Sequence, residues 1–214
     1  MNIKKIKLKW IVIGGIIILV VLGIYFNPDR KTEKVNAELG QIITSMNTTM
    51  QQVKQSITEN KVCFSDESLK DGKSADCVIN IRSIQDTFRT ADKANLAKLE
   101  AYYQANQSNL DKDTKDMIEN SLKLYKSDSY SNLMGAYDKY FSAYIEWHKY
   151  FRDYVGIKGV DNMTSEEIMR AKTLAQDVVS TEENLKLKTT AFSDYLNENF
   201  SKEFVSALMQ LGAK

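Results

Sequence analysis

The stretch that decides the fold is TSEEIMRAKTLAQDVVSTEENLKLKTTAFSDYLNENF, residues 164–200. Thr164 followed three residues later by Glu167 is the signature of a capping box, which opens a helix. Beyond it, apolar side chains recur at the three-to-four-residue spacing of one helix face. They are Ile168, Ala171, Ala175, Val178, Leu185, Phe192 and Leu196, and Glu182 and Thr189 fall on the same stripe. The pattern predicts one long amphipathic helix.

The same spacing continues through the chain beyond Pro28, its only proline. It predicts four further helices, over about residues 35–57, 77–103, 111–125 and 129–155. Asp111 stands where it can cap the third of these helices, and Gly156 stands where it can end the fourth. The predicted fold class is therefore all-α: an N-terminal transmembrane helix followed by an antiparallel bundle of four to five long helices.

The transmembrane helix is predicted from WIVIGGIIILVVLGIYF, residues 10–26, which contain no charged side chain. At about 1.5 Å per residue they span about 26 Å, close to the hydrocarbon thickness of a thin bilayer. Trp10 at one edge and Tyr25 and Phe26 at the other suit the membrane interfaces, where aromatic side chains concentrate. The predicted organisation is a basic cytoplasmic tail at 1–9, a signal-anchor helix at 10–26 and an extracytoplasmic helical-bundle domain at 27–214.

The orientation of this anchor follows from the charges beside it. Four lysines and no acid precede the span, so the positive-inside rule favours a cytoplasmic N-terminus. The expected location is the inner (plasma) membrane, crossed once, with the domain in the periplasm. A cleaved signal peptide is the alternative, but small residues should precede its cleavage site, and residues 23–28 read GIYFNP.

The charge of the remaining chain bears on its partners. All 28 acidic residues follow the span, as do all but four of the 29 basic ones, which leaves residues 27–214 mildly acidic. A mildly acidic domain with mixed charges lacks the basic patch that binds nucleic acid, so we do not expect nucleic acid as a partner. The lipid bilayer is the expected partner of residues 10–26.

Cys63 and Cys77 are the two cysteines of the chain. An even number of cysteines in an extracytoplasmic domain predicts a disulfide, with two unlinked thiols as the alternative. In the chain-entropy account, closing a loop of this length contributes about 3 kcal/mol. One cysteine follows the first predicted helix and the other opens the second, with the turn signal Asp71-Gly72 between them.

The residues for catalysis or metal binding are sparse. His148 is the only histidine, whereas a di-iron bundle uses two Glu-x-x-His pairs. Asp111-Lys112-Asp113 begins like a calcium loop but lacks the later Gly and the closing Glu. Glu182 interrupts an apolar stripe, for which a simple stutter in the pattern or a lysine partner is a plainer explanation than a polar pocket. We therefore expect no enzyme activity, no metal and no cofactor.

Aromatic side chains concentrate in one predicted helix, between Tyr130 and Tyr154. Projected on a helix, one wide face collects Tyr137, Tyr140, Tyr144, Trp147, His148, Phe151 and Tyr154, which we call the aromatic face. Core packing is one interpretation, with tyrosine hydroxyls reaching the rim. A surface for a partner or ligand is the other, because Tyr and Trp are favoured at interface hot spots.

These features favour a non-enzymatic interaction protein. The first hypothesis is an accessory or protective subunit that docks on a larger envelope or membrane assembly, through a protein partner or as a homo-oligomer. The alternative is a ligand-sensing helical bundle. With only residues 1–9 before the span, it would have to signal through a partner membrane protein.

Overall fold

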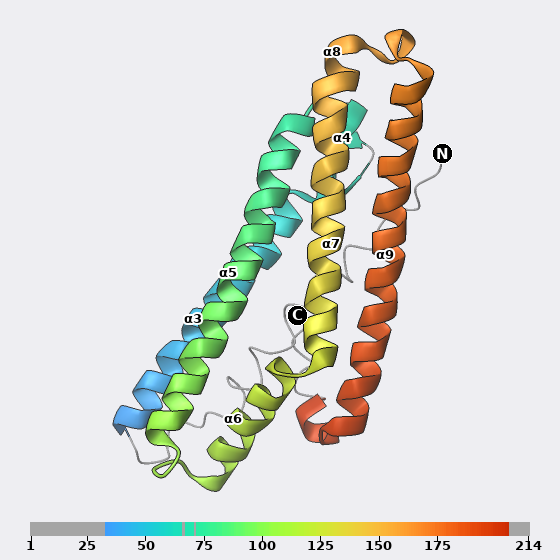
Figure 1. Cartoon of the computed structure of the whole chain (residues 1–214). Helices are drawn as coiled ribbons and strands as arrows, with labels where there is room; N and C mark the ends of the chain where they lie inside the picture. The colour runs from blue at the N-terminus through green and yellow to red at the C-terminus, as the bar shows by residue number, and fades with distance from the viewer. Residues whose placement is uncertain (1–32, 66, 71, 206–214) are drawn as a thin grey trace.

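A computed structural model describes residues 33–65, 67–70 and 72–205, and over these ranges the fold is all-α. Four long helices dominate it (Figure 1): α3 (Glu33–Glu59), α5 (Ser74–Asn106), α7 (Asp128–Tyr150) and α9 (Ser165–Asn199). Shorter elements connect them: η1 (Lys61–Phe64), α4 (Glu67–Lys70), α6 (Lys112–Tyr125), η2 (Phe151–Val155), α8 (Gly156–Lys158) and η3 (Val160–Asn162). The prediction of an all-α helical bundle is confirmed for this part of the chain.

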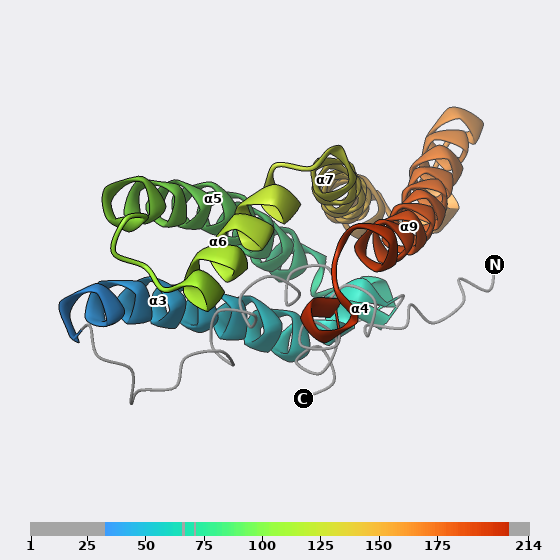
Figure 2. The same ribbon diagram turned by 90° about the horizontal axis from the view of Figure 1, so that it is seen from below.

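Successive long helices run antiparallel and pack in chain order, α3 on α5, α5 on α7 and α7 on α9 (Figures 1 and 2). The shorter α6 lies across the space between the lower ends of α5 and α7. Because α7 has a long helix on each side, its apolar surface must cover a wider arc than that of a helix with a single neighbour.

Two of the predicted helix starts have the expected hydrogen bonds. The Thr164 hydroxyl accepts from the N–H of Glu167 at 3.3 Å, and the Glu167 carboxylate accepts from the N–H of Thr164 at 2.7 Å. At the start of α6, the Asp111 carboxylate accepts from the N–H of Thr114 at 2.9 Å. The capping box and the Asp111 cap are therefore confirmed.

The prediction that Gly156 ends the fourth helix is wrong. Gly156 has a right-handed helical φ of −66°, and the helical chain continues through the π-helical turn η2 and through α8 to Lys158. The turn comes at Gly159, whose φ of 75° favours a residue without Cβ. The extra helical residues lengthen the α7 arm of the hairpin that α7 and α9 form.

The apolar stripe predicted in residues 164–200 is mostly the buried face of α9. Thr189 on this stripe satisfies its hydroxyl by donating to the carbonyl of Leu185 at 2.8 Å. Glu182 forms an ion pair with Lys186 at 2.5 Å, one helical turn away, so the interpretation of a lysine partner is confirmed. Ile168 departs from the stripe and is exposed; it lies in the first turn of α9, at the end of the hairpin.

The predicted disulfide is confirmed: Cys63 and Cys77 are bonded, with their Cα atoms 5.1 Å apart and both side chains buried. The bond ties η1 to the first turn of α5. Next to it, the ring of Phe64 packs edge-on against Phe141 and Tyr144 of α7, with centroids 6.1 and 5.6 Å away. The disulfide loop therefore covers part of α7.

Three predictions fall outside the described residues: the basic tail at 1–9, the anchor at 10–26, and the interfacial positions of Trp10, Tyr25 and Phe26. Among the helices that the structure does describe, none combines the length and apolar character required to cross a bilayer.

Candidate functional site

The aromatic face of α7 is largely part of the protein core. Tyr137, Tyr140, Tyr144, Trp147 and His148 are buried, and Phe151 is partly buried against the same core. Only Tyr154 of this set is exposed, with 43 % of its surface accessible. Core packing therefore describes six of the seven side chains, including Tyr140 and Trp147 on the flank that a partner surface would have required.

The rings on this face interlock along the helix. Tyr144 makes edge-on contacts with Tyr140 and Trp147, at centroid distances of 5.0 and 5.8 Å, and Trp147 makes another with Phe151 at 5.6 Å. Edge-on pairs at these distances are favourable beyond the burial of their area. The run of aromatics follows from the position of α7, which packs against both α5 and α9.

His148 is fully buried and joins α7 to the disulfide loop. Its Nε2 lies 2.8 Å from the carbonyl oxygen of Cys63, which makes Nε2 the protonated nitrogen of the neutral ring. Burial lowers the pKa of His148, and the bond to the Cys63 carbonyl opposes this effect only in part. The Ser74 hydroxyl donates to the backbone carbonyl of His148 at 2.5 Å, so it is engaged in a structural bond.

Two polar atoms in this region are buried with no hydrogen-bond partner among the described residues: the Tyr140 hydroxyl and the indole Nε1 of Trp147. Burial raises the pKa of Tyr140 well above its usual value, and the nearby Tyr144 and Glu182 raise it further. A buried polar group without a partner loses its hydration, at a cost of about 1–3 kcal/mol. Tyr140 and Trp147 are therefore places where the core is less than optimally stable.

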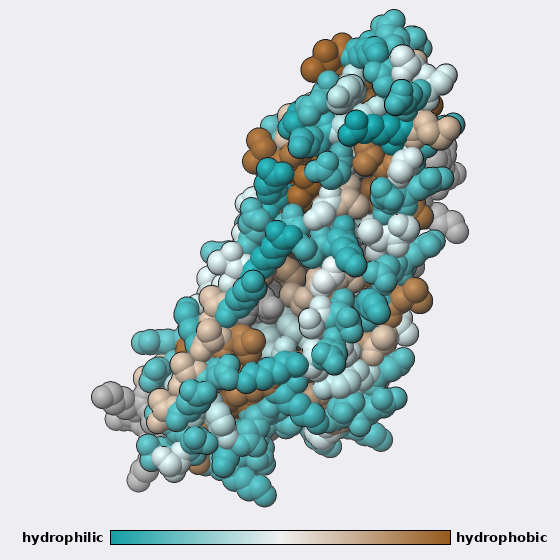
Figure 3. All heavy atoms as spheres, viewed as in Figure 1, coloured by the Kyte–Doolittle hydropathy of each residue, from teal (hydrophilic) through white to brown (hydrophobic). Residues whose placement is uncertain are grey.

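The end of the α7–α9 hairpin is the most apolar exposed region in the described part of the chain. Five of the eight large hydrophobic side chains that are exposed lie within residues 154–169, and we call them the hairpin end. They are Tyr154, Ile157, Val160, Ile168 and Met169. Figure 3 shows hydrophobic side chains at the top of the molecule, over this end of the hairpin.

An apolar hollow of about 230 Å³ lies next to the hairpin end. Its inner wall includes Trp147 and Phe151, and Val160, Met163 and Ile168 line its outer part. Sequence reasoning named Trp147 and Phe151 of the inner wall and Tyr154 of the hairpin end, but it missed the remaining residues, which read as a loop and as the start of a buried stripe.

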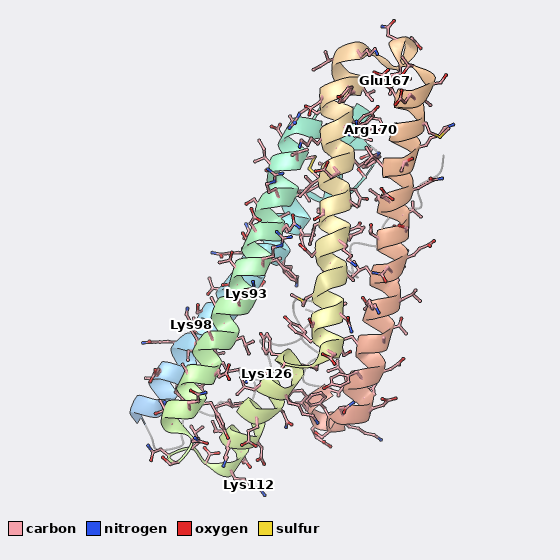
Figure 4. The ribbon with its side chains drawn as sticks, in the orientation of Figure 1. Lys93, Lys98, Lys112, Lys126, Glu167 and Arg170 are labelled. Atoms are coloured by element: carbon pink, nitrogen blue, oxygen red, sulfur yellow. A yellow bond between two sulfur atoms is a disulfide. The ribbon has the colours of Figure 1, made fainter. Side chains whose placement is uncertain are left out.

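The charged groups at this end are mostly engaged with neighbours. Lys158 forms an ion pair with Glu167 at 2.7 Å, and it is the main cause of the lowered pKa of that carboxylate. The Arg170 guanidinium lies over the Tyr150 ring, 5.2 Å from its centroid. Figure 4 places Glu167 and Arg170 near the end of the hairpin. The exposed apolar side chains are therefore surrounded by charged side chains that are already paired with neighbours. This arrangement is found at many interaction surfaces.

A second hollow lies between α5 and α7 and has a different character. Its volume is about 340 Å³, and its walls carry both apolar side chains and the charged groups Arg89, Lys93 and Asp138. The Arg89 guanidinium donates to both oxygens of Asp138 at 2.7 Å, and it is the main cause of the lowered pKa of that carboxylate. Sequence reasoning missed this site too; its one signal was Gly135, isolated inside a helical pattern.

The described residues contain no group of three or more His, Cys, Asp or Glu side chains that could hold a metal ion. Comparison with known proteins adds no assignment: no protein-family model matches the chain, nor does any curated protein or solved structure.

Proposed function

We propose that this chain is a non-enzymatic, membrane-anchored interaction protein. In this proposal it is an accessory or protective subunit that docks, through the hairpin end, on a protein component of a larger envelope or membrane assembly. The observation that carries the proposal is the concentration of exposed apolar side chains at one end of an otherwise polar bundle. Ile157, Val160 and Met169 expose 81, 64 and 64 % of their surfaces within one short stretch of the hairpin.

The direction in which the hairpin points supports a protein partner away from the anchoring bilayer. α3 begins at the opposite end of the bundle from the hairpin end (Figure 1). An anchor at residues 10–26 leaves six residues before Glu33, which reach at most about 25 Å. The hairpin, by contrast, includes the 35 residues of α9, about 52 Å long. The anchor and the hairpin end are thus suited to two different partners, a membrane and a protein.

Site-specific photo-crosslinking in native membranes tests this proposal. A photo-reactive amino acid at Ile157 should crosslink to one identified envelope or membrane protein, or to a second copy of the chain. The matched control is Leu187 on α9, which is 69 % exposed but far along the helix from the hairpin end. Crosslinking from Leu187 to the same protein with equal yield, or none from Ile157, would contradict docking through the hairpin end.

A substitution pair gives an independent measurement. Ile157→Asp places a charge in the apolar surface and should abolish co-purification of the crosslinked partner, whereas Leu187→Asp should leave it intact. Both side chains are exposed, so neither substitution should unfold the domain.

The alternative function is a ligand-sensing bundle that signals through a partner membrane protein. The mixed polar and apolar hollow between α5 and α7 favours it, because small-molecule sites in helical proteins lie between helices and combine an apolar lining with a few polar groups. In this alternative the signal passes to a partner membrane protein.

A further inference from the structure

The hollow between α5 and α7, which we call the α5–α7 pocket, has the construction of a binding site. Its volume of about 340 Å³ lies within the range of small-molecule sites. Phe88, Met134 and Phe141 supply apolar wall, and Phe141 is otherwise part of the buried core. The pocket lies on the middle of the bundle, so it is separate from the hairpin end.

The polar wall of this pocket is held in place by a buried amide. Gln85 is only 5 % exposed, and its side-chain nitrogen donates to the Asp138 carboxylate at 2.6 Å and lies 3.0 Å from the hydroxyl of Ser142. Asp138 also accepts two hydrogen bonds from the guanidinium of Arg89, one on each carboxylate oxygen. A carboxylate held from both sides keeps Arg89 in one orientation at the pocket, with further guanidinium N–H groups left over for a ligand.

Gly135 keeps the pocket open, and its presence in α7 has no other explanation in the described structure. A glycine inside a helix costs about 1 kcal/mol relative to alanine. Gly135 does not have a positive φ, and a Cβ added to it would meet no atom within 4 Å, so neither a turn nor a close contact requires glycine. It does line the α5–α7 pocket, where any side chain would occupy the free volume.

The charge balance of the pocket selects the kind of ligand. Arg89 and Asp138 neutralise one another, whereas Lys93 lines the pocket and forms no ion pair with any described residue. Figure 4 labels Lys93 on α5, on the middle part of the helix. Asp86, outside the lining, also acts on Arg89, so Lys93 is the charged side chain of the pocket lining that has no ion pair in the described structure, and it stands beside the apolar wall.

We propose that the α5–α7 pocket binds a small organic carboxylate with an aromatic or apolar body. The carboxylate lies between Lys93 and the outer N–H groups of Arg89, and the body packs against Phe88 and Met134. This inference does not rest on docking through the hairpin end, and the two are tested by different residues.

The direct test is a titration of the full-length protein in detergent with three carboxylates of increasing ring size. The probes are phenylacetate, indole-3-acetate and naphthalene-1-acetate. The neutral amide of each is tested in parallel, and binding is measured by isothermal titration calorimetry. At least one carboxylate should bind with a Kd below about 1 mM, and its amide should bind at least about tenfold more weakly, a difference of about 1.4 kcal/mol. If none of the carboxylates binds, or if amide and acid bind equally, the proposal is overturned.

Two matched pairs of variants locate the binding. Gly135→Leu fills the pocket with a good helix former, so binding should be lost while the melting temperature is kept or raised. Gly40→Leu is its control, because a Cβ at this position of α3 also meets no atom within 4 Å, and Gly40 does not line the pocket. Lys93→Gln should weaken binding of the carboxylate about tenfold and leave binding of the amide unchanged. Lys98→Gln on the same helix should change the binding of neither.

The outcomes are distinguishable from a folding effect. Lys93 is exposed and forms no ion pair with the residues that the structure describes, so Lys93→Gln is informative even if Gly135→Leu fails to fold. Undiminished binding in Gly135→Leu, or equal effects of the Lys93 and Lys98 substitutions, would overturn the assignment of the pocket. Ile157→Asp at the hairpin end should leave probe binding unchanged, which separates this inference from the docking proposal.

Discussion

Replacing Trp147 with alanine separates a core role from a partner role for the aromatic face. Trp147 is 4 % exposed, and its ring makes edge-on contacts with Tyr144, His148 and Phe151 at centroid distances of 5.8, 5.2 and 5.6 Å. Truncating a buried tryptophan costs about 3–5 kcal/mol, because apolar contacts are lost and a cavity is left. For a domain of this size, each kcal/mol lowers the melting temperature by about 2–4 °C, so we expect a decrease of about 10 °C.

The measurement is a pair of thermal melts followed by far-UV circular dichroism, with urea unfolding as the independent estimate of free energy. Trp147→Phe is the control, because it keeps one aromatic ring in place and removes the smaller ring of the indole, whose N–H has no partner among the described residues. It should therefore lose much less stability than Trp147→Ala. If Trp147→Ala loses less than about 1 kcal/mol, the core role derived from burial is refuted.

Three further predictions follow from the same core. Replacing Cys63 and Cys77 together with serine should cost about 3 kcal/mol, measured by urea unfolding, and intact protein should yield one linked peptide pair and no alkylatable thiol by non-reducing mass spectrometry. Tyr140→Phe removes a buried hydroxyl that has no partner of good hydrogen-bond geometry in the described structure, so it should be neutral or stabilising by about 1 kcal/mol; a loss of stability greater than that would indicate a hydrogen bond with the neighbouring Tyr144. Burial holds the pKa of folded His148 below its unfolded value of about 6.5, so its contribution to stability is full above about pH 6.5 and declines as the pH falls below that value. His148→Gln should remove this part of the pH dependence, and an unchanged slope would contradict it.

The helices themselves could be predicted from the sequence because their causes are local. A capping box depends on two residues three apart, and Thr164 with Glu167 forms the expected pair of hydrogen bonds. The spacing of apolar residues records which face of each helix is buried. The disulfide was predictable for a similar reason, since Cys63 and Cys77 stand at the ends of adjoining helices, only 14 positions apart.

The roles of the aromatic residues were not predictable, because exposure depends on which helices flank α7. Trp147 and Tyr154 lie on one side of the same helical wheel, yet one is buried against its neighbours and the other is 43 % exposed. Trp147 lies within α7, whereas Tyr154 lies in the π-helical turn η2, nearer the end of the hairpin. No periodicity within a single helix contains that information.

By itself, then, the sequence determined the all-α class, the approximate positions of the long helices, the N-terminal caps at Asp111 and Thr164, and the disulfide, because each depends on residues close together in the chain. Only the tertiary structure decided that α7 lies between α5 and α9 and that the hairpin end is apolar and exposed. The α5–α7 pocket is the clearest case, because Gly135 and Lys93 come from different helices 42 positions apart. Their meeting depends on the packing of α5 against α7, which no local pattern encodes.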